Sequence, residues 1–151
     1  MDKAKKDQIV SIIDQTNDMT IATIREDGFP QATTVSYIND GLTIYFATSP
    51  DSQKSRNLAR NNKVSITIDP PYKSWEDIVG LSLGGHAEPV TDQEEIEKVS
   101  ELMFAKFPQV ADYMSPNDVA PEDIAFFRIR PVAISLLDYR QGFGHTELFE
   151  L

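Results

Sequence analysis

The sequence contains no cysteine, which excludes disulfides, thiolate nucleophiles, iron–sulfur clusters and zinc held by cysteine. It has two histidines, His86 and His145, and they lie too far apart in the chain to form a metal-binding motif. No hydrophobic run approaches the roughly 20 residues needed to cross a membrane. The first residues, MDKAKKDQIV, are charged and lack the apolar centre of a signal peptide. We therefore expect no membrane partner and a cytoplasmic location.

Positive charge is also scarce. The 14 lysines and arginines are outnumbered by 24 aspartates and glutamates, which gives a formal net charge of −10. So acidic a surface repels the phosphates of nucleic acids and anionic membranes, and neither is expected as a partner. Any phosphate that this chain binds must be held by local groups. Lys54 and Arg56 form one of the tighter clusters of cations in the sequence.

The length of 151 residues, with 40% hydrophobic and 25% charged residues, predicts one globular domain over residues 1–151. Apolar periodicity and turn residues predict its elements. Helices are expected at 3–15, 50–60, 91–107 and 109–114. Strands are expected at 19–25, 31–38, 42–47, 63–69, 78–89 and 124–139, the last of them preceded by a linking loop at 115–122.

The order of these elements predicts the fold class. The first three strands are joined by tight turns at 26–28 and 39–41, which predicts an antiparallel meander. Pro131 within the last strand indicates an edge or a bulge, and the glycines in strand 78–89 indicate a bulge, a bend or a close ligand. In helix 91–107 we expect the apolar stripe to belong to the core. Six strands with inserted helices predict a mainly β fold, a small antiparallel barrel.

The stretch that carries most information is LTIYFATSPDSQKSRNL, residues 42–58. An apolar strand leads through a polar turn into a helix, with Pro50 and Ser52 as start signals. Free N–H groups, hydroxyls and Lys54 at a helix start suit a phosphate. The alternative is a well-capped amphipathic helix whose lysine and arginine are solvated.

Four pieces of the chain resemble the pyridoxamine 5'-phosphate oxidase-like family of FMN-binding split barrels, in its branch of small general-stress-protein-like members. They are MTIATIREDGFPQATTVSY, LTIYFATSPDSQKSRNLARNNKVSITI, LSLGGHAEPV and LLDYRQGFGHTELFEL. The most specific is a strand followed by Thr-Ser-Pro-x-Ser-x-Lys-x-x-Asn-Leu. The resemblance covers nearly the whole chain. It implies a six-stranded antiparallel split barrel that forms a homodimer with FMN at the subunit interface.

The resemblance also implies which residues bind the cofactor. Lys54 corresponds to the family lysine that contacts the FMN phosphate, with Ser52 just before it and Thr48 at the end of the preceding strand. The backbone of 33–36 corresponds to the strand that runs along the isoalloxazine ring. The full expected set is Thr33, Thr34, Val35, Ser36, Ala47, Thr48, Ser52, Gln53, Lys54, Trp75 and His145.

Trp75 and the segment 142–145 correspond to places from which the partner subunit reaches the cofactor. Trp75 alternatively caps the barrel, and His145 alternatively bonds a backbone carbonyl. His86 stands where the family often has a basic residue, and we expect it to be structural.

Three positions depart from the vitamin-B6 oxidases of the family. Thr33, Ile38 and Gln53 stand where those enzymes have basic residues, so oxidation of pyridoxine phosphate is not expected. The leading hypothesis is an FMN-dependent oxidoreductase with a small-molecule electron donor and acceptor; its chemistry would come from the flavin, not from a protein triad. The alternatives are a non-catalytic flavin-binding or stress-related protein, or the same fold with deazaflavin F420 or haem.

Overall fold

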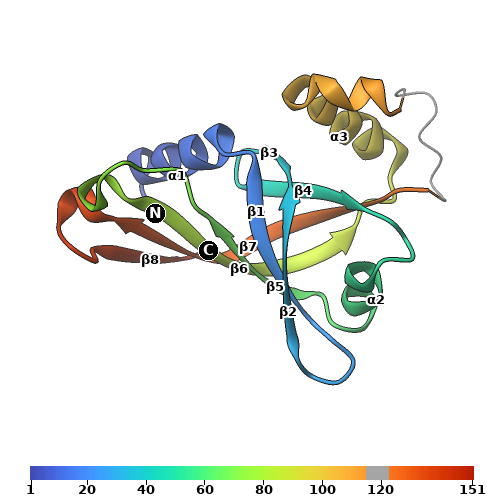
Figure 1. Ribbon diagram of the computed structural model, residues 1–151, viewed down its shortest axis with the longest axis horizontal. Helices are drawn as coiled ribbons and strands as arrows, with labels where there is room; N and C mark the ends of the chain where they lie inside the picture. The colour runs from blue at the N-terminus through green and yellow to red at the C-terminus, as the bar shows by residue number, and fades with distance from the viewer. Residues whose placement is uncertain (115–122) are drawn as a thin grey trace.

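A computed structural model of the chain describes residues 1–114 and 123–151. The loop expected at 115–122 lies outside the described residues. Figure 1 shows the arrangement of the helices and strands. In chain order the elements are α1 (Lys3–Gln15), β1 (Asp18–Ile24), β2 (Pro30–Ser36), β3 (Ile38–Asp40), β4 (Thr43–Thr48), α2 (Gln53–Arg60), β5 (Lys63–Ile68), η1 (Trp75–Asp77), β6 (Val79–Pro89), α3 (Gln93–Lys106), η2 (Pro108–Asp112), β7 (Ala125–Asp138), η3 (Tyr139–Gln141) and β8 (Thr146–Glu150).

The strands form one antiparallel sheet in the order β2-β1-β5-β6-β7-β4-β3, and β8 pairs with β7 beside this path. The expected mainly β class is therefore confirmed. The number of described strands is eight instead of six, for two reasons. The segment expected as one strand at 31–38 is divided into β2 and β3, and the C-terminal tail forms β8.

The expected meander of the first three strands is wrong. β2 pairs with β1, whereas β3 pairs with β4, and β4 continues the sheet by pairing with β7. The chain turns at Tyr37, whose side chain is buried and whose hydroxyl donates to the carbonyl of Ile13 at 2.7 Å. The backbone N–H of Tyr37 also donates to Asn17. This anchor on α1 ends β2 and directs β3 and β4 to the other side of the barrel.

The core has two parts. The larger lies inside the curved sheet, where α1 inserts Ile9, Ile12 and Ile13 against the strands. The smaller lies between α3 and the strands β3, β4 and β7, around Val99 and Phe126. Figure 1 accordingly shows α1 and α3 over different regions of the sheet. The expected core role of the apolar stripe of α3 is confirmed by this second cluster.

The proline within the last strand lies at a bulge, as expected. Gly84 pairs with Ala133 but Gly85 pairs with Pro131, so β7 has one extra residue between them. A Cβ atom at Gly85 would lie 2.6 Å from the carbonyl oxygen of Arg130. The glycine therefore permits a close approach of two strands, and bulges of this kind bend a sheet.

Within residues 1–114 and 123–151, no helix has both the length and the hydropathy to cross a membrane.

Candidate functional site

The turn between β4 and α2 concentrates hydroxyl groups. Ser52 is the N-cap of α2, and its Oγ accepts a hydrogen bond from the backbone N–H of Ser55 at 3.1 Å. Thr48, the last residue of β4, donates from Oγ1 to the same oxygen at 3.0 Å. The expected N-cap is thus confirmed. The helix itself begins at Gln53, so the predicted helical start at Pro50 is wrong, and the proline lies in the turn.

Lys54 connects this turn to a second part of the site. Its ammonium group donates to Thr33 Oγ1 on β2 at 3.1 Å. β2 lies at an end of the sheet path, with β1 as its neighbour. Two segments 21 residues apart in the sequence, the helix start and the edge strand, therefore meet at one pair of side chains. A lysine and several hydroxyls at a helix start form a set of donors suited to an anion.

The helix is held in place by Asn57, whose side chain is fully buried. Its amide nitrogen donates to Thr23 on β1 at 2.9 Å and to Gln31 on β2 at 3.1 Å. Its oxygen accepts from Gln53 at 2.8 Å. A buried amide that uses both its donors and its acceptor fixes α2 against the two strands. Asn57 lies within the motif at 48–58, but the sequence alone gives it no separate role. Its one local signal is that it follows Gln53 by four residues on the same helix face.

The residues of β2 alternate in exposure. Thr33 and Val35 are half-buried, and Thr34 and Ser36 are exposed. Ser36 donates from its hydroxyl to Asp18 at 2.7 Å. Of the four, Thr33 has a side-chain contact with Lys54, so a contribution of the others to a flavin site would come through the backbone. An edge strand suits that role, because its outer N–H and C=O groups face away from the sheet.

Two other expected residues lie elsewhere in the site. Gln53 turns its amide toward Asn57, with its oxygen accepting from Arg56 at 2.9 Å. Ala47 lies in the wall of a cavity beneath α3. Their contribution to cofactor binding stays a prediction.

Trp75 and His145 are not brought together with Lys54 within one chain. Figure 1 shows the start of β8 and α2 at opposite ends of the molecule. Trp75 is 64% exposed and stacks on Phe143, itself 82% exposed, with ring centroids 6.4 Å apart. Tyr139 packs edge-on against Phe143. These three aromatic residues form a cluster at the far end of the barrel.

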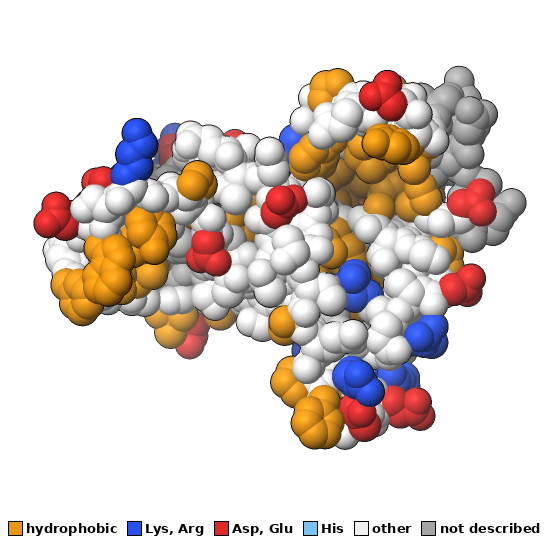
Figure 2. All heavy atoms as spheres, in the orientation of Figure 1, with side chains coloured by type: hydrophobic (Ala, Val, Ile, Leu, Met, Phe, Trp, Pro, Cys, Tyr) orange, Lys and Arg blue, Asp and Glu red, His pale blue; other side chains and the backbone are white. Residues whose placement is uncertain are grey.

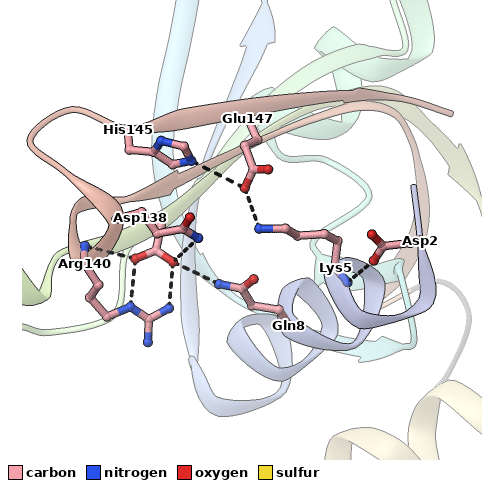
Figure 3. A network of polar contacts seen from close by, with 8 residues as sticks. Asp2, Lys5, Gln8, Asp138, Arg140, His145 and Glu147 are labelled. Atoms are coloured by element: carbon pink, nitrogen blue, oxygen red, sulfur yellow. Dashed lines mark hydrogen bonds and ion pairs between the residues drawn. The ribbon is translucent and has the colours of Figure 1, made fainter.

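His145 belongs to a polar network that links α1 with the hairpin of β7 and β8 (Figure 3). Its Nε2 lies 3.7 Å from Glu147, which in turn accepts from Lys5 of α1 at 2.6 Å. The hydrogen bond and charge of Lys5 lower the pKa of Glu147. His145 Nε2 is buried and has no hydrogen-bond partner among the described residues. The ring therefore does not bond a backbone carbonyl through this nitrogen.

Asp138 forms the other half of this network. Its side chain is buried, and it accepts two hydrogen bonds from the guanidinium of Arg140, at 2.7 and 2.9 Å. Gln8 of α1 donates to the same carboxylate at 3.2 Å. The Arg140 hydrogen bonds lower the pKa of Asp138 to about 2. This carboxylate thus ties η3 and α1 together and has the features of a structural group.

His86 lies on β6, with Nδ1 3.2 Å from the side-chain oxygen of Asn62, and it is partly exposed. That contact joins β6 to the end of α2 and agrees with the expected structural role.

Positive charge gathers near α2 despite the acidic composition. Figure 2 shows lysine and arginine side chains at the end of the molecule that holds α2 and the β1–β2 turn. Arg25 is paired with Asp27 at 2.9 Å, and Arg60 lies 4.0 Å from Glu26. Lys54 has a hydroxyl as its hydrogen-bond partner. Arg56 likewise donates to neutral oxygens, the backbone carbonyl of Asp51 and the side chain of Gln53. Lys54 and Arg56 are thus the cations of α2 whose described contacts leave their charge uncompensated, and of the two Lys54 reaches β2.

The family described as pyridoxamine 5'-phosphate oxidase matches residues 6–138 of the chain. General stress protein 26 of Bacillus subtilis is 24% identical over 138 residues, which are 87% of this chain and 96% of that protein.

Solved structures share the fold over nearly the whole chain. A conserved hypothetical protein from Mycobacterium tuberculosis superimposes with a TM-score of 0.76 and 26% identity, covering 97% of this chain and 91% of that one. A haem-binding protein from Mycobacterium smegmatis superimposes with a TM-score of 0.78 and 21% identity, covering 99% of this chain and 58% of that one. The second likeness is a likeness of fold.

Proposed function

The chain belongs to the pyridoxamine 5'-phosphate oxidase family, and from this premise we propose that it binds FMN at a dimer interface and acts as an oxidoreductase. The observation that carries the proposal is the junction of α2 with β2. Lys54, Thr33 and the hydroxyls of Thr48 and Ser52 converge there, in a chain whose other charges are mostly negative.

These residues fit the phosphate of FMN. The N–H groups of Gln53 and Lys54, in the first turn of α2, have no partner inside the helix. With the Ser52 and Thr48 hydroxyls and the Lys54 ammonium they offer several donors to a dianion. A single lysine among neutral donors suits one phosphate group.

The exposed backbone edge of β2 suits the isoalloxazine ring of FMN. Its backbone at 33–36 begins beside Lys54, so the phosphate and the ring would be bound by adjoining parts of one surface. Successive N–H and C=O groups of a strand can bond both the donors and the acceptors on the polar edge of an isoalloxazine. Bound FMN would supply the electron transfer.

The partner subunit would complete the site with Trp75 and His145. Trp75 packs against Phe143 just before β8, and the start of β8 lies at the opposite end of the chain from α2 (Figure 1), so these residues can reach a flavin only across an interface. The aromatic cluster of Trp75, Phe143 and Tyr139 is largely exposed, and exposed apolar clusters of this kind mark binding surfaces. Within one chain His145 Nε2 is buried and faces Glu147, so the ring would have to turn to contact a flavin there.

Oxidation of pyridoxine phosphate is not part of the proposal. Ile38, one of the three departures from the vitamin-B6 oxidases, is buried in an apolar cluster, and Gln53 bonds Asn57. Neither supplies a cation for the phosphate of a second molecule.

An absorption spectrum with and without added FMN, followed by anaerobic NADPH, tests the proposal. Flavin bands that saturate and then bleach are the expected result. Bands that never bleach would instead support the non-catalytic, stress-related reading that the Bacillus subtilis relative suggests.

Haem is the second candidate cofactor, because a haem-binding protein shares the fold. The chain has no cysteine, and the rings of its two histidines are already placed against Asn62 and Glu147. A Soret band on addition of haemin, without flavin uptake, would replace FMN by haem. F420 carries a long acidic tail, which a chain of net charge −10 would repel.

A further inference from the structure

A cavity of about 390 Å³ lies between α3 and the strands β2, β3 and β4. Figure 2 shows it as a hollow lined with hydrophobic side chains below α3. Its volume falls at the lower end of the range for small-molecule sites. Val35, Ala47, Met103, Phe107 and Phe126 contribute to its wall.

The chemistry of the wall selects against charge. No lysine, arginine, aspartate or glutamate is among the described residues that line it. Its polar groups are mostly engaged: Tyr45 donates to Glu95 at 3.0 Å, and Ser36 donates to Asp18 at 2.7 Å. A charged ligand would lose its hydration here without gaining a partner. Aromatic and thioether side chains instead favour a flat apolar molecule.

The helix above the cavity is held from several directions. Arg128 of β7 forms ion pairs with Glu95 of α3 and with Glu88 of β6. Lys98 pairs with Asp40 of β3, and Lys106 donates to the carbonyl of Thr16 at 2.7 Å. Contacts at both ends of α3 therefore fix the distance between the helix and the sheet, which keeps the cavity preformed.

The cavity adjoins the expected flavin strand. Val35 and Ser36 belong both to its wall and to the segment 33–36 of β2. A ligand in the cavity would thus lie beside a ring bound along that segment.

We propose that this cavity binds a neutral aromatic molecule of one or two fused rings, and that it receives the substrate of the protein. The first part stands on the cavity alone; the second rests on the proposed flavin function. The uncharged, aromatic wall favours a neutral aromatic ligand, and the continuity of the wall with β2 favours the substrate role.

The test uses 2-naphthol and 2-naphthoate, which share one ring system and differ in charge at pH 7. Binding to the full chain is measured by calorimetry, with and without FMN. We expect 2-naphthol to bind in both cases and 2-naphthoate to bind at least about tenfold more weakly, because its charge must be desolvated.

Met103→Trp should fill the cavity and weaken 2-naphthol binding at least about tenfold, because the indole ring would occupy the space that the ligand needs. Ala105→Trp adds the same side chain to an exposed position of α3 outside the wall and should leave binding within about twofold. Val110→Trp fills the cavity from η2 and replaces Met103→Trp if circular dichroism shows that variant unfolded.

Equal binding of 2-naphthol to both cavity variants and to Ala105→Trp would overturn the site. Wild-type protein that binds FMN but not 2-naphthol would overturn it too, as expected if a second copy of the chain fills the cavity. Displacement of 2-naphthol by FMN would overturn the substrate role. Binding that is lost in Met103→Trp while FMN never binds would uphold the site and refute the flavin function.

Discussion

Lys54 Nζ lies 3.1 Å from Thr33 Oγ1, so the first turn of α2 and the edge strand β2 share a hydrogen bond. The contact places an ammonium group where the turn proposed to bind the phosphate meets the strand expected to carry the flavin ring. A neutral hydroxyl is a weak competitor for the lysine, because an anion would add the attraction of opposite charges to the hydrogen bond.

Replacement of Lys54 by alanine is expected to weaken FMN binding. Loss of one charged hydrogen bond costs about 1.5–3 kcal/mol, or roughly ten- to hundredfold in the dissociation constant. Flavin fluorescence titration measures the effect. Lys6→Ala removes the same charge from an exposed site on α1 and should bind FMN as the wild type does. Equal affinities of the two variants would refute the phosphate assignment.

Ser52 can be tested for two separate roles. As the N-cap of α2, its replacement by alanine should lower the free energy of unfolding by about 0.5–2 kcal/mol, and glycine should cost only a few tenths. Both variants lose the hydroxyl, so both should bind FMN more weakly. Urea denaturation and flavin titration of the two variants separate the roles. If FMN binding weakens in the less stable alanine variant but not in the glycine variant, the serine only caps the helix.

Asn57 is expected to be the main polar support of the site. Asn57→Ala leaves Thr23 and Gln31 without their buried partner and should destabilise the fold by about 1–3 kcal/mol. Asn17→Ala serves as the control, because this exposed residue bonds Tyr37 through its backbone carbonyl and not through its side chain. Similar unfolding midpoints for the two variants would contradict the assigned role.

Asp138 should make the stability of the protein depend on acid. Its folded pKa, about 2, lies below the ordinary value of 3.8, so the folded state holds the charged form more strongly than the unfolded chain does. The stabilisation, about 2 kcal/mol, is complete above pH 4 and is lost as the pH falls toward 2. Urea denaturation between pH 7 and pH 2 measures it.

Asp138→Asn should lower stability at pH 7 and flatten the fall below pH 4. Asp69→Asn changes an exposed aspartate and should preserve the wild-type profile. If the stability of Asp138→Asn falls below pH 4 as steeply as that of the wild type, other carboxylates control the acid dependence of stability.

The aromatic cluster should be part of the subunit interface. Light scattering is expected to give a dimer, and Phe143→Ser should shift it toward monomer while lowering flavin occupancy. Phe29→Ser changes another exposed phenylalanine, in the β1–β2 turn, and should leave the dimer intact. A monomer with full flavin occupancy would rule out an interface site.

Local features of the fold could be predicted from the sequence. The stripe of α1, the cap at Ser52 and the bulge near Pro131 depend on neighbours a few residues away, so periodicity and turn residues reveal them. The mainly β class follows from the short connections. The family could be identified for a similar reason, since its most specific motif lies within one continuous stretch.

The tertiary structure alone decided which strands are neighbours and which side chains meet. Tyr37 interrupts the expected three-stranded meander because its hydroxyl donates to the carbonyl of Ile13 on α1. No local sequence pattern encodes that contact. Lys54 meets Thr33, and Asn57 meets Gln31, because α2 packs across β1 and β2. The cavity beneath α3 likewise exists only once the helix is fixed over the sheet, since its wall is drawn from distant parts of the chain.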